Sequence, residues 1–205
     1  MTHIGNYAYT CKLEKLARIT EDEWINIMER RNCRVSDHPV TEENKTAWRD
    51  CYRVLRDCAE QLPAQFRKLD IVFEYVLPLC PPGHRGSERG LGVRADVLLV
   101  SAKTVMVLEF KQRSDVFIGH VRQARKYRSR IQNFHKESLG MFKRAILVLT
   151  AGEGIREQYH KVSVRSRDLL AQEIIHLFED SPTPHPDFRS WLNSSFEIRK
   201  GFKVR

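Results

Sequence analysis

The hydrophobic pattern begins with two amphipathic helices. Thr20 and Thr41 are each followed directly by acidic residues, as is common in the first turn of a helix. Apolar side chains spaced by three and four residues follow each threonine, and the second stripe continues without interruption to Pro63. The pattern therefore predicts one helix after Thr20 and a longer helix of about six turns after Thr41.

Strands and further helices follow in an order that is typical of an α/β protein. Apolar runs predict strands at 71–77, in a hairpin over 93–112, at 145–149 and around 161–164, with helices at about 118–136 and after Ser166. From the helix after Thr41 onward, the order is α-β-β-β-α-β. This order predicts a small mixed β-sheet flanked by helices.

Two breaks in the pattern divide the chain. Residues 78–92 are rich in proline and glycine, which is typical of a loop, and a second proline-rich break lies at 181–186. We expect a helical extension over 1–40, a main domain over 41–180, and a peripheral segment or linker over 181–205.

Composition narrows the class of protein. No apolar run approaches the roughly 18 residues that a membrane span needs, and the N-terminal residues lack the apolar centre of a secretory signal. The chain has five cysteines and no CxxC pair. Cys51 and Cys58 lie on the buried side of a predicted helix, so we expect them to be core thiols. These features predict a cytoplasmic protein that makes no membrane contact.

The positive charge is concentrated in one segment. The net charge of the chain is +9, and the segment from Lys111 to Arg144 holds ten Lys or Arg residues against only two acids, Asp115 and Glu137. Nearly the whole excess therefore lies in this segment. Such a patch favours contact with the phosphate backbone of a nucleic acid. The alternative is a solvated helix face.

Three charged residues, Asp96, Glu109 and Lys111, lie in the otherwise apolar hairpin. An unpaired charge in a buried strand costs several kcal/mol, so their presence calls for a reason. If the strands turn around Ala102 and Lys103, residues whose numbers add to 205 face each other, and Asp96 lies opposite Glu109. Side chains alternate along a strand, so Glu109 and Lys111 share a face. Two carboxylates and an ammonium at one end of a hairpin are typical of a metal site.

This arrangement resembles the PD-(D/E)xK nuclease superfamily. The closer likeness is to the nuclease domains at the N-terminus of certain bacterial nuclease–helicase/ATPase proteins. Those domains carry an EYxLP block, an RxD block, an (I/L)E(L/F)K block and a helix with a glutamine. The matching residues are Glu74–Pro78, Arg94–Asp96, Leu108–Lys111 and Gln123. The likeness covers roughly residues 41–165, and it lacks the proline of the superfamily's name.

The resemblance implies a restriction-endonuclease-like core over 41–180 that hydrolyses DNA with Mg²⁺ or Mn²⁺. Hard divalent cations prefer oxygen ligands, which the carboxylates of Asp96 and Glu109 supply. The family adds the backbone carbonyl of Phe110 as a ligand. Lys111 is expected to orient the attacking water and to offset transition-state charge, and Gln123 is expected to position them.

The position of a further acid stays open at this point. Glu74 is either a metal ligand or an ion-pair partner of Arg94. Asp57 and Glu60 on the long helix are also available, and nothing in the sequence selects one. The expected DNA contacts are Arg94, Arg113, Arg122, Lys126, Tyr127 and Arg130.

Alternative interpretations of the same residues differ in function class. Glu109 with Lys111, and Asp96 with Arg94, could be ordinary ion pairs of a non-catalytic nucleic-acid-binding module. The chain could also be the effector domain of a larger nuclease–ATPase system, of an anti-phage or DNA-repair type, with a helicase/ATPase as partner or fused domain. Cleavage of both strands of a duplex would usually call for a homodimer or for two cutting events. The sequence does not specify whether the substrate is DNA or RNA, duplex or single-stranded.

Overall fold

Both predicted helix starts carry a reciprocal cap. Thr20 accepts a hydrogen bond from the backbone N–H of Glu23, whose carboxylate accepts one from the backbone N–H of Thr20. Thr41 and Asn44 make the same pair of bonds. Each arrangement satisfies backbone donors that a helix end leaves free, and a single cap of this kind stabilises a helix by about 1 kcal/mol.

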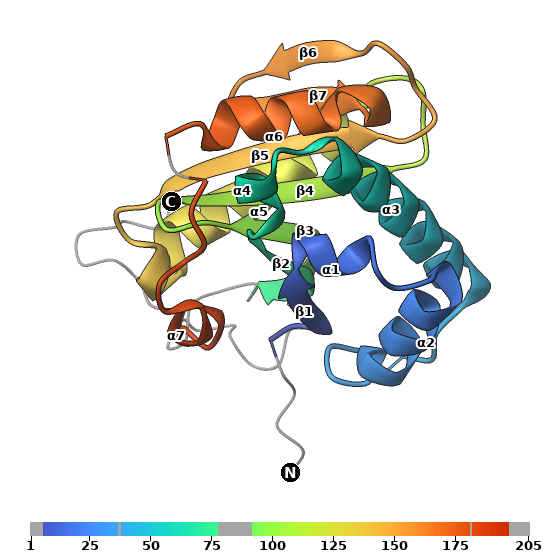
Figure 1. The fold of residues 1–205 in the computed structure, drawn as a ribbon, viewed down its shortest axis with the longest axis horizontal. Helices are drawn as coiled ribbons and strands as arrows, with labels where there is room; N and C mark the ends of the chain where they lie inside the picture. The colour runs from blue at the N-terminus through green and yellow to red at the C-terminus, as the bar shows by residue number, and fades with distance from the viewer. Residues whose placement is uncertain (1–5, 37, 78–91, 181, 197–205) are drawn as a thin grey trace.

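The computed structural model describes residues 6–36, 38–77, 92–180 and 182–196. Within them, seven strands form one mixed sheet in the order β1-β2-β3-β4-β5-β7-β6 (Figure 1). The strands are β1 Tyr9–Lys12, β2 Asp70–Leu77, β3 Val93–Val100, β4 Thr104–Lys111, β5 Phe142–Leu149, β6 Arg156–Tyr159 and β7 Val162–Ser166. The helices are α1 Leu13–Leu16, α2 Glu21–Asn32, α3 Glu42–Gln61, α4 Ala64–Arg67, α5 Ile118–Phe134, α6 Leu170–Phe178 and α7 Phe188–Leu192.

The predicted α/β class and element order are confirmed. The pairs β1–β2, β2–β3 and β3–β4 are antiparallel, whereas β4–β5 and β5–β7 are parallel. The helix α5 connects the parallel strands β4 and β5. The edge strands β1 and β6 were not predicted, because neither carries an apolar run that would mark it. No helix among the described residues is long and apolar enough to cross a membrane.

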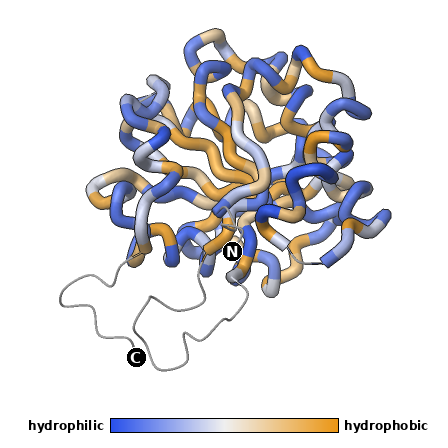
Figure 2. Tube along the Cα trace, turned by 90° about the horizontal axis from the view of Figure 1, so that it is seen from below, coloured by the Kyte–Doolittle hydropathy of each residue, from blue (hydrophilic) through white to orange (hydrophobic). Residues whose placement is uncertain are grey.

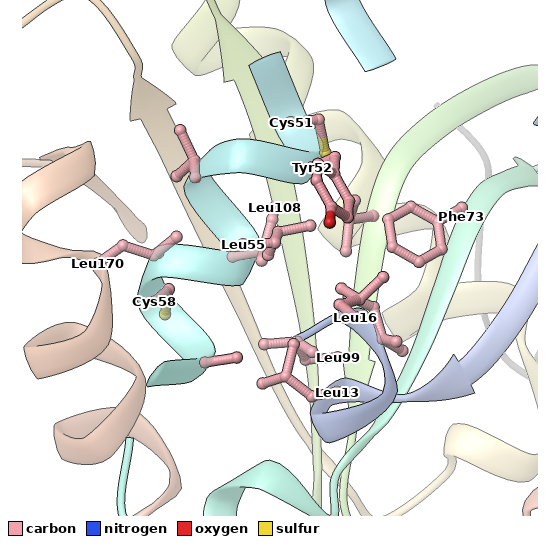
Figure 3. Close-up of a cluster of buried hydrophobic side chains, with 14 of the residues drawn as sticks. Leu13, Leu16, Cys51, Tyr52, Leu55, Cys58, Phe73, Leu99, Leu108 and Leu170 are labelled. Carbon is pink, nitrogen blue, oxygen red and sulfur yellow. The ribbon is translucent and has the colours of Figure 1, made fainter. Parts of the chain in front are cut away.

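Two apolar cores lie on the two faces of the sheet. One core packs α2, α3 and α6 against the sheet, and the other packs α5 and α7 against the opposite face. Figure 3 shows the first core, where Tyr52 and Leu55 of α3 meet Phe73, Leu99 and Leu108 of the sheet. Figure 2, coloured by hydropathy, shows hydrophobic strands inside the molecule and hydrophilic segments outside. Because both faces are covered, the central strands are mainly apolar, with charged residues such as Glu74, Asp96 and Glu109 as exceptions.

The cysteines of the long helix are core thiols, as expected. Cys51 and Cys58 are buried and free, and burial raises the pKa of the Cys58 thiol to about 12. A thiol that stays protonated at neutral pH behaves as a small apolar group.

The two ends of the described chain contribute to the cores. Trp24 of α2 packs against Phe73, with ring centroids 4.4 Å apart. Trp191 of α7 is fully buried, and its indole N–H donates to the hydroxyl of Ser138 at 2.9 Å. The expectation that the C-terminal segment is peripheral is therefore wrong for α7, which covers the second core.

We predict that Trp191→Ala lowers the free energy of unfolding by about 3–5 kcal/mol, because it removes a large buried side chain. Urea denaturation measures the change, with the exposed neighbour substitution Ser190→Ala as the control. A Trp191→Ala protein as stable as the control would contradict the packing of α7 on the core.

Candidate active site

Strands β3 and β4 separate at the end of the hairpin that carries the charged residues. The predicted register is confirmed for four pairs, from Val100–Val105 to Val97–Leu108. The ladder ends there, one position before Asp96 and Glu109, while β4 stays paired with β5 as far as Lys111. The expected cross-strand pair of Asp96 and Glu109 is thus absent from the ladder. This leaves a gap in the hydrogen bonding between β3 and β4 beside Asp96 and Glu109.

Asp96 fills this gap with its side chain. Its carboxylate accepts a hydrogen bond of 2.8 Å from the backbone N–H of Phe110. Beyond Val97 and Leu108, β3 no longer pairs with β4, so the carboxylate takes over a donor of β4. The bond fixes Asp96 against the strand that carries Glu109 and Lys111.

The backbone changes direction at Glu74, the β2 residue beside Asp96. Glu74 has a φ of 53°, which is the left-handed region that a residue with a side chain enters at a cost of about 1–3 kcal/mol. Phe73 packs into the core of α2 and α3, whereas Tyr75 packs into the core of α5. An undistorted strand would place both on one face. On β3, Val97 and Ala95 are divided in the same way. The sheet therefore reverses its side-chain alternation at Glu74 and Asp96.

Glu109 and Lys111 form a buried ion pair. The Lys111 Nζ lies 2.7 Å from Oε1 of Glu109, and the Glu109 side chain is 0% exposed. The other carboxylate oxygen, Oε2, is buried and has no hydrogen-bond partner among the described residues. A buried anionic oxygen without a partner is costly, so it requires a proton or a cation. Oε2 of Glu109 is therefore available to bind a proton or a cation.

Glu74 is held by two neighbours. Its Oε1 accepts a hydrogen bond of 3.0 Å from the indole N–H of Trp48, and its Oε2 lies 3.4 Å from Nη1 of Arg94. Of the two roles left open for Glu74, the structure shows the ion pair with Arg94. The carboxylate still borders the site, because it lines the same cavity as Asp96 and Lys111.

Burial and mutual repulsion disfavour the charged form of all three carboxylates. Burial raises the pKa of Glu74 to about 7, with a further contribution from Asp96. Burial also raises the pKa of Asp96, and burial together with Asp96 raises that of Glu109. Burial acts to lower the pKa of Lys111, but Glu109 and Asp96 outweigh it and raise the pKa. Among the described residues, Lys111 and Arg94 are the cations that act on these three carboxylates, which leaves excess negative potential in the cluster.

The donor chemistry fits a small divalent cation. Mg²⁺ is commonly held by one or two carboxylates and retained waters, and Asp96, Glu109 and the carbonyl of Phe110 are oxygen donors of this kind. The unpartnered Oε2 of Glu109 supports this fit. In the described ranges, no group of three or more His, Cys, Asp or Glu side chains is arranged as a complete metal site. A cation would therefore depend on the carbonyl and on water for its remaining ligands.

Gln123 reaches the site through Tyr127. The Gln123 side-chain amide donates to the Tyr127 hydroxyl at 2.8 Å. Burial and the nearby carboxylate of Glu109 raise the pKa of Tyr127, which places its ring beside the cluster. Tyr127 is also buried and lines a cavity of about 390 Å³ with Arg94 and Asp96. It is therefore better placed to position active-site groups than to contact DNA from the surface.

A cavity of about 420 Å³ lies between the N-terminal half of α3, the middle of β2 and β3, and the end of β4. Asp50 of α3 lines it, and its carboxylate accepts a hydrogen bond from the Thr150 hydroxyl. The two α3 acids considered from the sequence, Asp57 and Glu60, are exposed and do not line this cavity. Asp50 lies two helical turns before Asp57, so the helical spacing alone did not separate the acid that lines the cavity from the acids that face solvent.

The expected DNA contacts differ in exposure. Arg113, Arg122 and Lys126 are exposed, and Arg113 forms an ion pair of 2.8 Å with Asp115. Arg130 is buried, with 9% of its surface exposed, so it drops out of the candidate DNA contacts. The basic segment therefore has a solvent-facing part along α5 and an inward-facing part.

Comparison with protein-family models and with curated proteins finds no match for this chain. Its function must accordingly be argued from the geometry of the site.

We predict that Glu109→Gln stabilises the metal-free protein at pH 8 by roughly 1–3 kcal/mol. The pKa of Glu109 is higher in the folded state than in the unfolded state, so ionisation opposes folding as the pH rises above the ordinary pKa of 4.5. The gain should be largest at pH 8 and should shrink towards pH 5. Urea denaturation with a chelator present measures it.

The exposed carboxylate Glu60 provides the matched control, as Glu60→Gln. A Glu109→Gln protein that is less stable than wild type at pH 8 would show that Lys111 more than compensates the buried charge.

Proposed function

We propose that this protein is a metal-dependent nuclease that hydrolyses phosphodiester bonds in DNA. The observation that carries the proposal is the meeting of Asp96, Glu109 and Lys111 where β3 and β4 separate, with one oxygen of Glu109 unpartnered among the described residues. The order α3-β2-β3-β4-α5-β5 supports a restriction-endonuclease-like arrangement, in which this end of the sheet carries the active site.

Asp96, Glu109 and the carbonyl of Phe110 would hold Mg²⁺ or Mn²⁺. The chemistry that such an ion supplies is polarisation of the scissile phosphate and a lower pKa for a bound water. Glu74 is engaged by Trp48 and Arg94, so its contribution is negative potential beside the site.

Lys111 acts as a charged donor in this proposal. Glu109 and Asp96 raise its pKa, so the amine is protonated at neutral pH and cannot serve as a general base. Its ammonium can orient the attacking water and can stabilise negative charge that develops on the phosphate oxygens. Lys111 is partly exposed, with 24% of its side chain accessible, so a substrate can reach it.

The remaining residues position the reacting groups and the substrate. The N–H of Phe110 holds the carboxylate of Asp96 in place. The side-chain amide of Gln123 donates a hydrogen bond to the hydroxyl of Tyr127, which lies beside the buried carboxylates. Arg113, Arg122 and Lys126 offer exposed positive charge next to the site for the DNA backbone. A helicase/ATPase partner or a second copy of the chain would extend this activity, but a single nick requires neither.

We predict that Lys111→Ala and Asp96→Ala each lower DNA cleavage at least about 100-fold, because each removes charge stabilisation or a metal ligand. Nicking of supercoiled plasmid with Mg²⁺ or Mn²⁺ measures the rate. Lys103→Ala, an exposed lysine at the opposite end of the same hairpin, serves as the control and should cleave like wild type.

Cleavage that survives both active-site substitutions would refute the assignment of the site. A wild-type protein that binds DNA but cleaves none of the plasmid, duplex or single-stranded substrates would favour the non-catalytic binding module.

A further inference from the structure

A second cavity, of about 420 Å³, lies away from the candidate active site. It is bordered by the middle of α5, the beginning of β5, the strands β6 and β7 at the sheet edge, and α6 (Figure 1). Its charged lining is strongly basic: Arg128, Lys143, Arg144, Lys161 and Arg165 face one carboxylate, Glu173. The exposed imidazoles of His160 and His176 also border it. No part of the proposed catalytic chemistry uses this cavity.

The one carboxylate in the described lining is already neutralised. Both Nε and Nη2 of Arg165 lie 2.7 Å from Oε2 of Glu173, and both side chains are buried. Lys143 donates its ammonium to the backbone carbonyls of Ser138 and Met141. The charges of Arg128, Arg144 and Lys161 are therefore not balanced by an acid in the described lining of the cavity.

The guanidinium of Arg128 is half-buried, lies near other positive charges and has a hydrogen-bond donor without a partner among the described residues. Its Nη1 reaches the carbonyl of Lys143 at 3.5 Å, and its buried Nε has no hydrogen-bond partner among the described residues. Burial lowers the pKa of Arg128, and the neighbouring Arg125 and Arg144 lower it further. An anion bound beside Arg128 would accept a hydrogen bond from its Nε and would offset the repulsion from the neighbouring arginines.

The exposed face of α5 connects this cavity with the active site. Arg125 and Lys126 are exposed on the helix between Gln123, near the catalytic cluster, and Arg128, at the cavity, and Arg122 is exposed directly before Gln123. Residues three and four apart lie on one side of a helix, so their charges form a continuous track. A polyanion that follows this track would reach both ends.

We propose that this cavity binds phosphate groups of a nucleic-acid backbone, as a second contact apart from the site of cleavage. The identity of the polyanion as nucleic acid rests on the proposed function. The distance between the two sites follows from the sheet register, in which Lys111 pairs with Leu149 and Met106 with Arg144. Five residues of β-strand span roughly 16 Å, which corresponds to about five base pairs of duplex.

The test compares two double variants for binding to fluorescent duplex DNA in EDTA, where cleavage cannot contribute. Arg144→Gln/Lys161→Gln removes two exposed charges of the cavity, and Arg18→Gln/Arg34→Gln removes two exposed charges of the N-terminal helical region as the control. For a duplex of about 20 base pairs, we expect the cavity variant to bind roughly tenfold more weakly. The slope of log K against log salt should fall by about two.

A cavity variant that binds the long duplex with the affinity and salt slope of the control would overturn the proposal. The proposal would also be overturned if inorganic phosphate or ATP bound to the cavity of the wild-type protein while the cavity variant bound DNA as wild type does. The cavity would then bind a free phosphate compound. Arg128→Gln supplies a second variant, and urea denaturation checks that each protein is folded.

Cleavage assays separate this proposal from the nuclease assignment. With Mg²⁺ and saturating DNA, the cavity variant should keep the wild-type cleavage rate. If the wild-type protein cleaves no DNA and the cavity variant still binds DNA more weakly, the phosphate-binding proposal would stand and the nuclease assignment would be refuted.

Discussion

The hydrogen bond from the N–H of Phe110 to the carboxylate of Asp96 is the contact on which the candidate site depends. Strand β4 stays paired with β5 as far as Lys111, whereas β3 pairs with β4 only from Val97 to Val100 and is held before Val97 by β2. The backbone N–H of Phe110 needs an acceptor at this point, and the side chain of Asp96 supplies it from β3. The same bond brings a carboxylate to the strand that carries Glu109 and Lys111. The site therefore lies where the pairing between β3 and β4 ends.

The site is assembled at a cost to folding, which the two cores offset. Glu74 has a left-handed backbone conformation, and the carboxylates of Glu74, Asp96 and Glu109 are all harder to ionise than in water. Apolar packing on both faces of the sheet, with α3 on one side and α5 on the other, holds the strands that carry these groups. Strain and unbalanced charge that a well-packed frame maintains are typical of functional sites. A bound cation would relieve the excess negative charge, and the proposal of a metal-dependent reaction rests on this point.

Much of the fold could be predicted because the apolar pattern is regular where the strands are regular. The hairpin register follows from Val97 to Val100, and the caps at Thr20 and Thr41 mark the helix starts. The prediction failed where regular alternation ends. A sequence does not show that Glu74 enters a left-handed conformation, so the reversal of faces there was not foreseen. It was likewise not possible to see that Asp50 lines the cavity beside the site while Asp57 and Glu60 face solvent, since all three fit the same helical pattern. Trp191 was expected in the core, but the packing of α7 on the sheet was not foreseen, because it depends on residues distant in sequence, among them Tyr75 and His135.

The most direct test of the central claim is titration of the protein with Mn²⁺, followed by electron paramagnetic resonance of the free ion. The account predicts one site per chain that is lost in Asp96→Asn and in Glu109→Gln and is kept in Asp57→Asn, whose carboxylate is exposed on α3. Because the ion competes with protons for carboxylates of raised pKa, its affinity should increase from pH 6 to pH 8. Unchanged Mn²⁺ binding in both active-site variants, or no binding by the wild-type protein, would contradict the account.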